Sequence, residues 1–265
     1  MAARDDYVCP RCGGSTWVID ENGDSTPCDC RGKRIRRART RGLVTTIPRR
    51  FSGLAISDDG RQITDHGRPL NFAPEVSRAV LKYCRAIDEQ LERGHGLWFE
   101  GDTGTGKTTL AMLVSKQALK TGHSVAIYSM PRLLATIRNT FDSDSDSSYA
   151  ALFKQLTAVD LLHLDDVGAE QQTEWVLEQL YSIVNERYEE GKAVMITTNL
   201  GIADLRKQIG ERTVSRLMEM CGDALPLYGS DRRVEFDPAR PDPFASAGDE
   251  PTARRIEGEP VTGDA

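Results

Sequence analysis

One short stretch restricts the possible folds of this chain more than any other. Residues 101–108 read GDTGTGKT, which fits the phosphate-binding pattern G-x-x-x-x-G-K-[ST]. An apolar run suited to a strand (97–100) precedes the stretch, and residues 109–114 continue as a helix. Glycines let backbone N–H groups surround a polyphosphate, and the start of the helix adds the positive end of its dipole. The sequence therefore predicts a nucleoside triphosphate site, rather than a glycine-rich turn that fits the pattern by chance.

The pattern also assigns the residues of this site. Lys107 is expected to reach the β- and γ-phosphates, and the Thr108 hydroxyl is expected to bind Mg²⁺. The predicted nucleotide-binding residues are the loop, the first helical residues and one carboxylate: Gly101, Asp102, Thr103, Gly104, Thr105, Gly106, Lys107, Thr108, Thr109 and Asp165.

A second apolar run, over 159–164, ends in the carboxylates Asp165 and Asp166. In enzymes with this phosphate loop, one strand-end carboxylate holds Mg²⁺, and a neighbouring group orients or deprotonates the attacking water. Asp165 suits the first role and Asp166 the second; an acidic loop after a buried strand is the alternative. A third apolar run, over 193–198, places the amide of Asn199 at its end, where it could position the same water.

Apolar runs of strand length alternate with segments of helical periodicity along the chain. Helices are expected over 74–93, 149–158, 173–190, 202–210 and 211–221, and a further strand over 124–129. This alternation predicts an α/β domain with a parallel sheet and helices on both faces.

Composition and charge restrict the cellular location and the partners that we expect for this chain. The 265 residues are 39% hydrophobic and 28% charged, which is ordinary for a soluble protein. The sequence has no apolar stretch of membrane-spanning length and no signal-like N-terminus, so we expect a cytoplasmic protein without a membrane partner. A net charge of −6 argues against nucleic acid, but residues 31–50 are rich in arginine and contain no acid. That segment is either a phosphate-contacting surface or a solvated linker.

Four of the six cysteines lie in two close pairs near the N-terminus: Cys9 and Cys12, then Cys28 and Cys30. Fifteen residues separate the pairs, which is within the range of a zinc ribbon. Disulfides are the competing interpretation, but nothing in the sequence indicates export. We therefore predict a zinc ribbon over 1–31, a basic linker over 32–50, an ATPase domain over 51–237 and a disordered tail over 238–265.

These motifs resemble the DnaC/DnaI-type helicase loaders of the AAA+ ATPases and the related IstB-type transposition helpers. The resemblance extends from Cys9 to about Phe236 and is carried by residues 101–109, 161–168, 197–199 and 210–217, together with the cysteine pairs. Transposition helpers usually lack such a cysteine module, which favours the loaders. The resemblance implies an AAA+ fold, ATP with Mg²⁺ as cofactor, and hydrolysis. Because Asp166 is a slightly weaker base than the glutamate common at this position, we expect slow turnover.

The resemblance further implies roles for arginines near the C-terminal end. In this family one subunit's arginine reaches the neighbour's γ-phosphate, and Arg216 fits that role best, with Arg212 as the alternative. Residues 229–233 are similar to a G-x-D-x-R element, which makes Arg233 the expected sensor-2 residue; Arg232 departs from the usual residue at its position.

The partners implied are a replicative hexameric helicase, single-stranded DNA and further copies of the chain. The DNA contact is expected over 130–157, which contains the basic residues Arg132, Arg138 and Lys154 and the aromatic residues Phe141, Tyr149 and Phe153. Two other hypotheses are a transposition helper that binds duplex DNA and a zinc adaptor whose nucleotide site is structural.

Overall fold

The centre of the fold is a five-stranded sheet in which every pairing is parallel. The computed structural model describes residues 9–21, 23–32, 43, 46–141 and 147–231. The strands are β6 (Leu97–Gly101), β7 (Val125–Ser129), β8 (Leu161–Asp165), β9 (Ala193–Thr198) and β10 (Leu225–Leu227), in the order β10-β6-β9-β8-β7.

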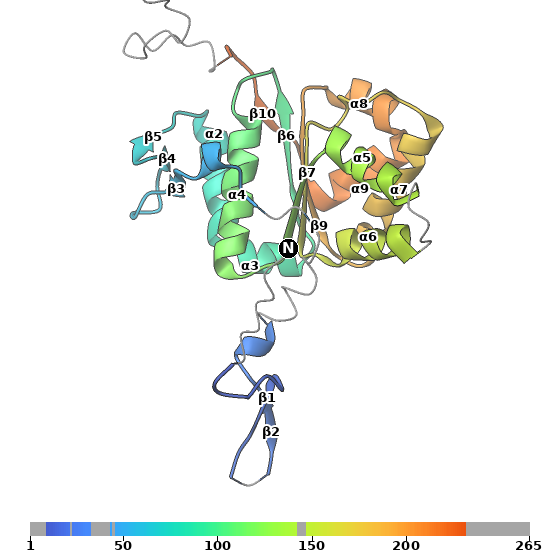
Figure 1. Cartoon of the computed structure of the whole chain (residues 1–265). Coiled ribbons are helices and arrows are strands. Elements are labelled where there is room, and N and C mark those ends of the chain that lie inside the picture. The colour runs from blue at the N-terminus through green and yellow to red at the C-terminus, as the bar shows by residue number, and fades with distance from the viewer. Residues whose placement is uncertain (1–8, 22, 33–42, 44–45, 142–146, 232–265) are drawn as a thin grey trace, which may run out of the picture. The chain divides into compact units, whose positions relative to one another are not determined.

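The strands are apolar on both faces, because each face is covered by helices. Successive residues alternate between two buried clusters: Ala193 and Met195 of β9 belong to one, and Val194 and Ile196 to the other. Helices α2 (Pro74–Arg85), α3 (Ile87–Glu92) and α4 (Lys107–Thr121) cover one face. The other face is covered by α5 (Met130–Phe141), α6 (Ser147–Ala158), α7 (Glu174–Glu189), α8 (Ile202–Ile209) and α9 (Glu211–Cys221) (Figure 1).

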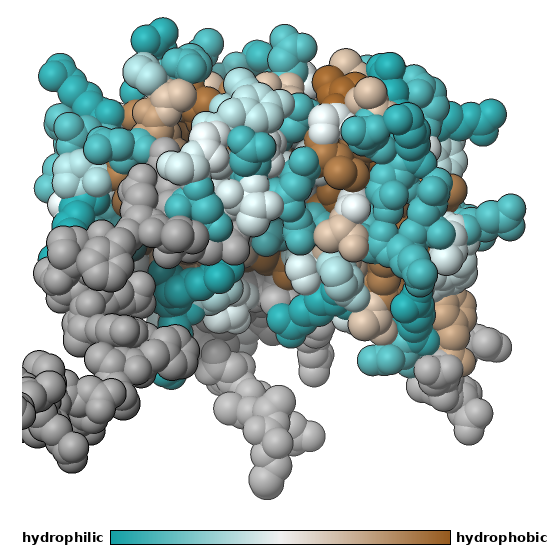
Figure 2. Space-filling model, turned by 90° about the horizontal axis from the view of Figure 1, so that it is seen from above, coloured by the Kyte–Doolittle hydropathy of each residue, from teal (hydrophilic) through white to brown (hydrophobic). Residues whose placement is uncertain are grey.

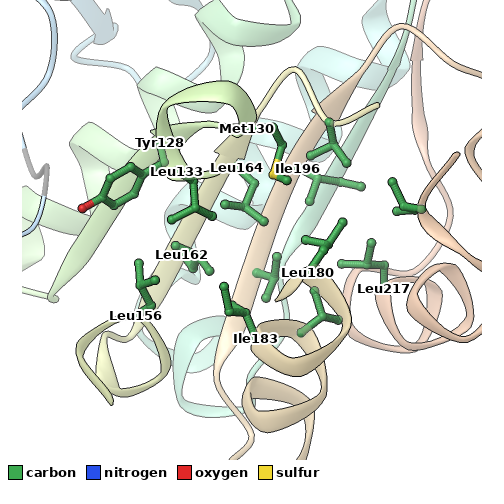
Figure 3. Packing of buried hydrophobic residues seen from close by; sticks show 14 of the residues in the cluster. Tyr128, Met130, Leu133, Leu156, Leu162, Leu164, Leu180, Ile183, Ile196 and Leu217 are labelled. Atoms are coloured by element: carbon green, nitrogen blue, oxygen red, sulfur yellow. The ribbon is translucent and has the colours of Figure 1, made fainter. Parts of the chain in front are cut away.

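The second cluster shows how closely the helices meet the sheet. Leu162, Leu164 and Ile196 point from the strands toward Ile183 and Leu180 of α7, and all five are at most 2% exposed (Figure 3). Burial of this kind stabilises by about 25 cal/mol per Å² of apolar surface. The predicted α/β fold with a parallel sheet and helices on both faces is therefore confirmed.

Several elements differ from the sequence prediction, which did not contain the short strand β10. The helix expected over 74–93 is interrupted at Ala86, whose backbone (φ −102, ψ 24) ends α2 before α3 begins. Ile87 and Leu91 after the break remain buried, so both pieces contact the same core. A small antiparallel sheet of β3 (Leu54–Ile56), β4 (Ile63–Asp65) and β5 (Arg68–Pro69), preceded by the 3₁₀ turn Arg49–Phe51, was not predicted, because such short strands carry little periodicity.

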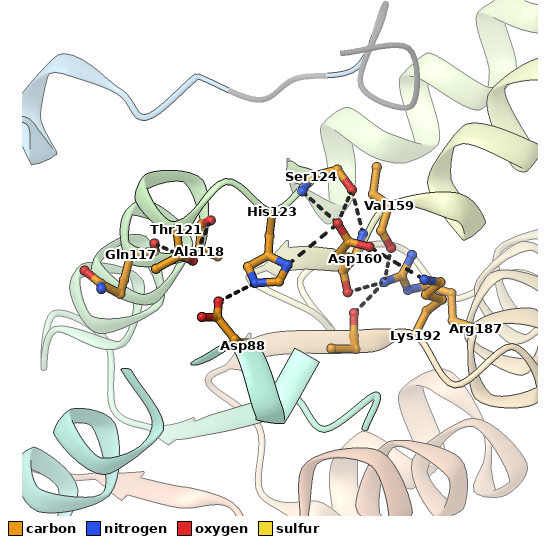
Figure 4. A network of polar contacts seen from close by, with 11 residues as sticks. Asp88, Gln117, Ala118, Thr121, His123, Ser124, Val159, Asp160, Arg187 and Lys192 are labelled. Carbon is orange, nitrogen blue, oxygen red and sulfur yellow. Dashed lines mark hydrogen bonds and ion pairs between the residues drawn. The ribbon is translucent and has the colours of Figure 1, made fainter. Parts of the chain in front are cut away.

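A polar network joins the N-terminal ends of β8 and β9 (Figure 4). The fully buried Arg187 of α7 donates to the carbonyls of Leu156 (2.6 Å), Val159 (2.9 Å) and Ala193 (2.6 Å). Burial lowers the pKa of Arg187 to about 9, which still leaves it protonated at neutral pH. Beside it, Asp160 accepts from the backbone N–H and hydroxyl of Ser124 at the start of β7. The network thus satisfies the carbonyls of Leu156 at the C-terminal end of α6 and of Val159 in the link to β8, together with that of Ala193 in β9.

The cysteine-rich segment is a short antiparallel hairpin of β1 (Trp17–Ile19) and β2 (Ser25–Pro27). Most of the basic linker, the tail over 238–265 and residues 142–146, which are rich in aspartate and serine, lie outside the described residues. Within the described part of the chain, no helix is long and apolar enough to cross a membrane.

Candidate nucleotide-binding site

The phosphate-binding loop joins β6 to α4, at one end of the sheet. Gly106 immediately precedes α4 with a left-handed backbone (φ 101), and a Cβ at this position would lie 2.7 Å from a ring carbon of Phe72. Only glycine combines this backbone with the close contact. The loop therefore has the strand–loop–helix context that the sequence predicted.

Lys107 lies across the loop at the first position of α4. Its Nζ donates to the carbonyl oxygens of Gly101 (2.8 Å) and Asp102 (2.6 Å), and the residue is only 7% exposed. The Thr105 hydroxyl also donates to the Asp102 carbonyl, at 2.8 Å. A buried ammonium held inside a glycine-rich loop is placed to meet phosphate oxygens.

Asp165 at the end of β8 connects three elements. Its Oδ1 accepts from the hydroxyls of Thr108 on α4 (2.9 Å) and Thr197 on β9 (2.8 Å), and His163 Nε2 lies 3.8 Å away. Burial by itself would raise the pKa of Asp165, but His163 and the two hydroxyls outweigh burial and lower it. An ionised carboxylate beside a threonine hydroxyl is a suitable oxygen ligand set for Mg²⁺, so the predicted magnesium residues lie together.

Thr197 belongs to this site although the sequence prediction did not include it. Its hydroxyl donates to Asp165 and also accepts from the backbone N–H of Asp166, at 2.9 Å. The signal in the sequence was its place in the Thr-Thr-Asn run that ends in Asn199. That this run lies beside the strand of Asp165 is seen only in the structure.

Asp166 has an unusual backbone for a non-glycine residue, with φ at 61. Its Oδ1 accepts from the Asn199 side-chain amide at 3.0 Å. The structure therefore brings together the two residues predicted to act on the attacking water, and the amide fixes the direction of the carboxylate.

His163 lies below this site in β8 and is fully buried. Its Nδ1 is 3.0 Å from the Ser115 hydroxyl of α4, whereas its Nε2 has no hydrogen-bond partner among the described residues. Of the two ring nitrogens, only Nδ1 therefore has a hydrogen-bond partner among the described residues.

The segment after β10 returns to the phosphate loop. The Leu227 carbonyl accepts from the Asp102 N–H (3.1 Å), and the Asp102 carboxylate accepts from the Gly229 N–H (3.1 Å). The Asp231 carboxylate occupies the space that a side chain at Gly104 would need. Arg233, the expected sensor-2 residue, and the neighbouring Arg232 lie outside the described residues.

The two arginines predicted as candidates for contact with a neighbouring subunit's γ-phosphate lie on α9 and differ in their surroundings. Arg212 is exposed, whereas Arg216 is half-buried over the rings of Tyr181 and Tyr188 of α7. Both line one open pocket of about 570 Å³.

The four predicted zinc ligands also meet. The Sγ atoms of Cys9, Cys12, Cys28 and Cys30 all lie within 4.8 Å of one another, with Cys9 and Cys28 at 3.8 Å and Cys12 and Cys30 at 3.4 Å. Tetrahedral thiolates at about 2.3 Å from zinc are about 3.8 Å apart, far beyond a disulfide bond of about 2.05 Å. All four are free cysteines, so the geometry fits zinc and excludes the disulfide alternative in this structure.

Comparison with known proteins gives consistent matches. The family of IstB-like ATP-binding proteins matches residues 70–219, more than half of the chain. The uncharacterized protein YdaV of Escherichia coli (strain K12) is 30% identical over 144 residues, which cover 54% of this chain and 57% of YdaV. The replicative helicase loader DnaC of the same strain is 29% identical over 119 residues, covering 45% of this chain and 48% of DnaC. The chain thus spans about half the length of these two relatives.

Among solved structures, the crystal structure of the DnaC helicase loader has a TM-score of 0.54 and 26% identity, and the match covers 68% of this chain and 99% of that one. These matches confirm the resemblance that the sequence motifs predicted.

Proposed function

Because this chain belongs to the family of IstB-like ATP-binding proteins, we propose that it is an ATP-dependent loader of a replicative hexameric helicase. The proposal is carried above all by the likeness to the DnaC helicase loader, which extends over 99% of that crystal structure. In the proposed cycle the protein binds the helicase and single-stranded DNA in its ATP-bound form and is released after hydrolysis.

The residues around the phosphate loop support slow ATP hydrolysis. Lys107 binds the β- and γ-phosphates, and Thr108 with Asp165 would hold Mg²⁺, which neutralises charge on the phosphates when bound. Asp166, oriented by the Asn199 amide at 3.0 Å, positions the attacking water and accepts its proton. The transferred group needs positioning and charge neutralisation more than covalent chemistry, so these contacts suffice for a switch.

Completion of the site is proposed to require a second copy of the chain. Arg216 of one subunit reaches the γ-phosphate bound by its neighbour, with Arg212 on the same pocket as the alternative. A guanidinium is always charged and can fork onto phosphate oxygens, which suits this contact. Arg233, with Arg232 as the alternative, is proposed to contact phosphate from within the same chain.

The cysteine module is proposed to bind zinc and to dock on the helicase. Its hairpin exposes Ile19 (71%) and Trp17 (40%), which are apolar residues on a segment with little core of its own. Arg31 stacks on Trp17, with the guanidinium carbon 4.1 Å from the ring centroid. Zinc ligation would supply the folding free energy of such a segment.

The α5–α6 region is the proposed contact for single-stranded DNA. Phe141 is 57% exposed and stacks on Tyr149 with a centroid distance of 5.0 Å, and Tyr149 in turn contacts Phe153 and the core. Phe141 is therefore the ring most available to a base. Among the basic residues of this region, Arg138 stacks on Trp175, with its guanidinium carbon 4.9 Å from the ring centroid. Arg132 and Lys154 are exposed.

The second candidate is a transposition helper that coats duplex DNA, which the match to IstB-like proteins favours. A zinc adaptor with a structural nucleotide site is the third hypothesis. An adaptor would bind its partner equally well after Lys107→Ala, whereas a transposition helper would bind duplex DNA with no helicase present.

The test is co-elution of the protein with the replicative helicase of its host, with and without ATP and Mg²⁺. A complex with the wild type that is lost in a Cys9→Ser/Cys12→Ser variant is expected. No complex under any condition, for protein that is folded and binds ATP, would reject the loader and favour the transposition helper.

A further inference from the structure

We infer that Tyr181, Tyr188 and Glu219 position Arg216 for contact with a phosphate bound by a neighbouring copy of the chain. This inference rests on the proposed trans role of Arg216. It adds three positioning residues that do not themselves touch the nucleotide.

The two tyrosines share one face of α7, because they are seven residues, or about two turns, apart. The guanidinium carbon of Arg216, on the adjacent α9, lies 4.7 Å from the Tyr188 ring centroid and 5.6 Å from that of Tyr181. These distances are within the range of cation–π attraction. Together with their neighbours, the three side chains line the open pocket of about 570 Å³.

Stacking leaves the binding capacity of the arginine intact. A guanidinium uses its planar face on the rings, whereas its five N–H donors point outward from its edge. No carboxylate within the described part of the chain forms an ion pair with Arg216. The side chain is therefore restricted in direction while its donors stay available, which reduces the conformational entropy lost on reaching a phosphate.

Glu219 explains why Arg216 stays unpaired. The two residues are three apart on α9, a spacing at which opposite charges on a helix normally meet. Instead, Glu219 Oε2 accepts from the Tyr188 hydroxyl at 2.7 Å. Tyr188 therefore acts twice: its ring orients Arg216, and its hydroxyl holds the carboxylate that would otherwise neutralise it.

Assemblies that mix two variant subunits test the positioning of Arg216 separately from the ATP site that it contacts. Lys107→Ala subunits supply an intact Arg216 surface but no ATP site, and Arg216→Ala subunits supply an ATP site but no arginine. Each variant alone should be near background, and the mixture should regain activity at the shared sites. The positioning variants are then introduced only into the Lys107→Ala subunit, so that the hydrolysing site itself is unchanged.

Tyr188→Phe in that subunit keeps the ring but releases Glu219, and kcat should fall roughly 10-fold with an unchanged KM for ATP. Glu219→Gln added to the same subunit should restore most of the activity, because the competing charge is gone. Glu190→Gln, which removes an exposed carboxylate at the C-terminal end of α7, is the matched control and should restore nothing. Tyr181→Leu should lower kcat without rescue by Glu219→Gln.

The outcomes separate the two proposals. If the parent mixture stays inactive although the subunits co-assemble, the trans role of Arg216 fails, and this inference fails with it. If the parent mixture is active but Tyr188→Phe performs like the parent, the positioning role alone is overturned. A loss that Glu219→Gln does not reverse would overturn the role of Glu219.

Discussion

At the scale of single residues, the site depends on hydroxyl groups as much as on charges. Asp165 is held by Thr108 and Thr197, and Asp166 is held by Asn199 and by its own N–H on Thr197. Thr197 thus connects both carboxylates at the end of β8. A residue that orients ligands in this way commonly affects activity about 10–100-fold when it is removed.

Thr197→Val should therefore lower kcat for ATP hydrolysis about 10–100-fold while ATP binding changes little. The variant keeps the volume but loses the hydroxyl that donates to Asp165 and accepts from Asp166. Steady-state hydrolysis and equilibrium binding of a fluorescent ATP analogue measure the two effects. Thr197→Ser, which retains the hydroxyl, should remain close to wild type, and equal losses in both variants would contradict this role.

At the scale of elements, the three-residue strand β10 is short but has a large effect on the site. By pairing with β6 it brings Gly229 and Asp231 onto the phosphate loop. Gly104 is the point of closest approach, and its φ of 80 also disfavours any side chain. The loop and the C-terminal segment are therefore packed as one unit.

Gly104→Ala should weaken ATP binding at least about 10-fold, because the new Cβ both meets Asp231 and sits on a left-handed backbone that costs an L-residue about 1–2 kcal/mol. Adding Asp231→Ala should recover part of the loss, since it removes the collision but not the backbone cost. Titration with a fluorescent ATP analogue measures both. Wild-type binding by Gly104→Ala would show that the contact with Asp231 is not required.

At the scale of the whole molecule, stability depends on polar contacts at the end of the sheet where β8 and β9 begin. His123 lies between Asp160, 3.8 Å from its Nδ1, and Asp88, 2.7 Å from its Nε2 (Figure 4). Asp160 and then Asp88 raise the pKa of His123. For Asp160, burial raises the pKa, but His123, Ser124 and Lys192 outweigh burial and lower it.

The pH dependence follows from these directions. A histidine whose pKa is raised in the folded protein makes its full contribution to the free energy of unfolding at pH values below its pKa in the unfolded chain, about 6.5. This contribution is lost as the pH rises through the pKa of the folded state. His123→Gln should therefore destabilise by about 0.5–1 kcal/mol near pH 6 and by less near pH 8.5. Urea unfolding of both proteins at each pH measures the difference. A difference that grows with pH would contradict a charged His123.

None of the described residues of the cysteine module belongs to either hydrophobic cluster, so we expect the module to be stabilised separately from the nucleotide-binding part of the chain. We expect about one zinc per chain by elemental analysis, and less in Cys28→Ser. Removal of zinc by a chelator should unfold the module and abolish helicase binding, with ATP binding unchanged. Loss of ATP binding on chelation would show that the two units depend on each other.

The surface above the carboxyl ends of the strands, where the phosphate loop lies, is largely hydrophilic, with small hydrophobic areas between polar side chains (Figure 2). A hydrophilic face of this kind is suited to contact with a charged nucleotide and with a second copy of the chain. It is less suited to a permanent interface, which is usually more hydrophobic.

The sequence by itself determined the loop, the strand–helix order and the thiolate set, because each depends on local spacing. Lys107, Thr108 and the four cysteines are recognisable from neighbours a few residues away, and alternation of apolar runs is enough to predict a parallel sheet. Family likeness added the candidate arginines, but not their surroundings.

Only the tertiary structure decided which distant side chains meet. Thr197 reaches Asp165 across neighbouring strands, Asp231 reaches Gly104 through an edge strand too short to predict, and Tyr188 diverts Glu219 from Arg216 between two helices. Each of these contacts depends on strand order or helix packing. Such pairings are set by burial of whole faces against one another, and local periodicity in a single chain carries no information about them.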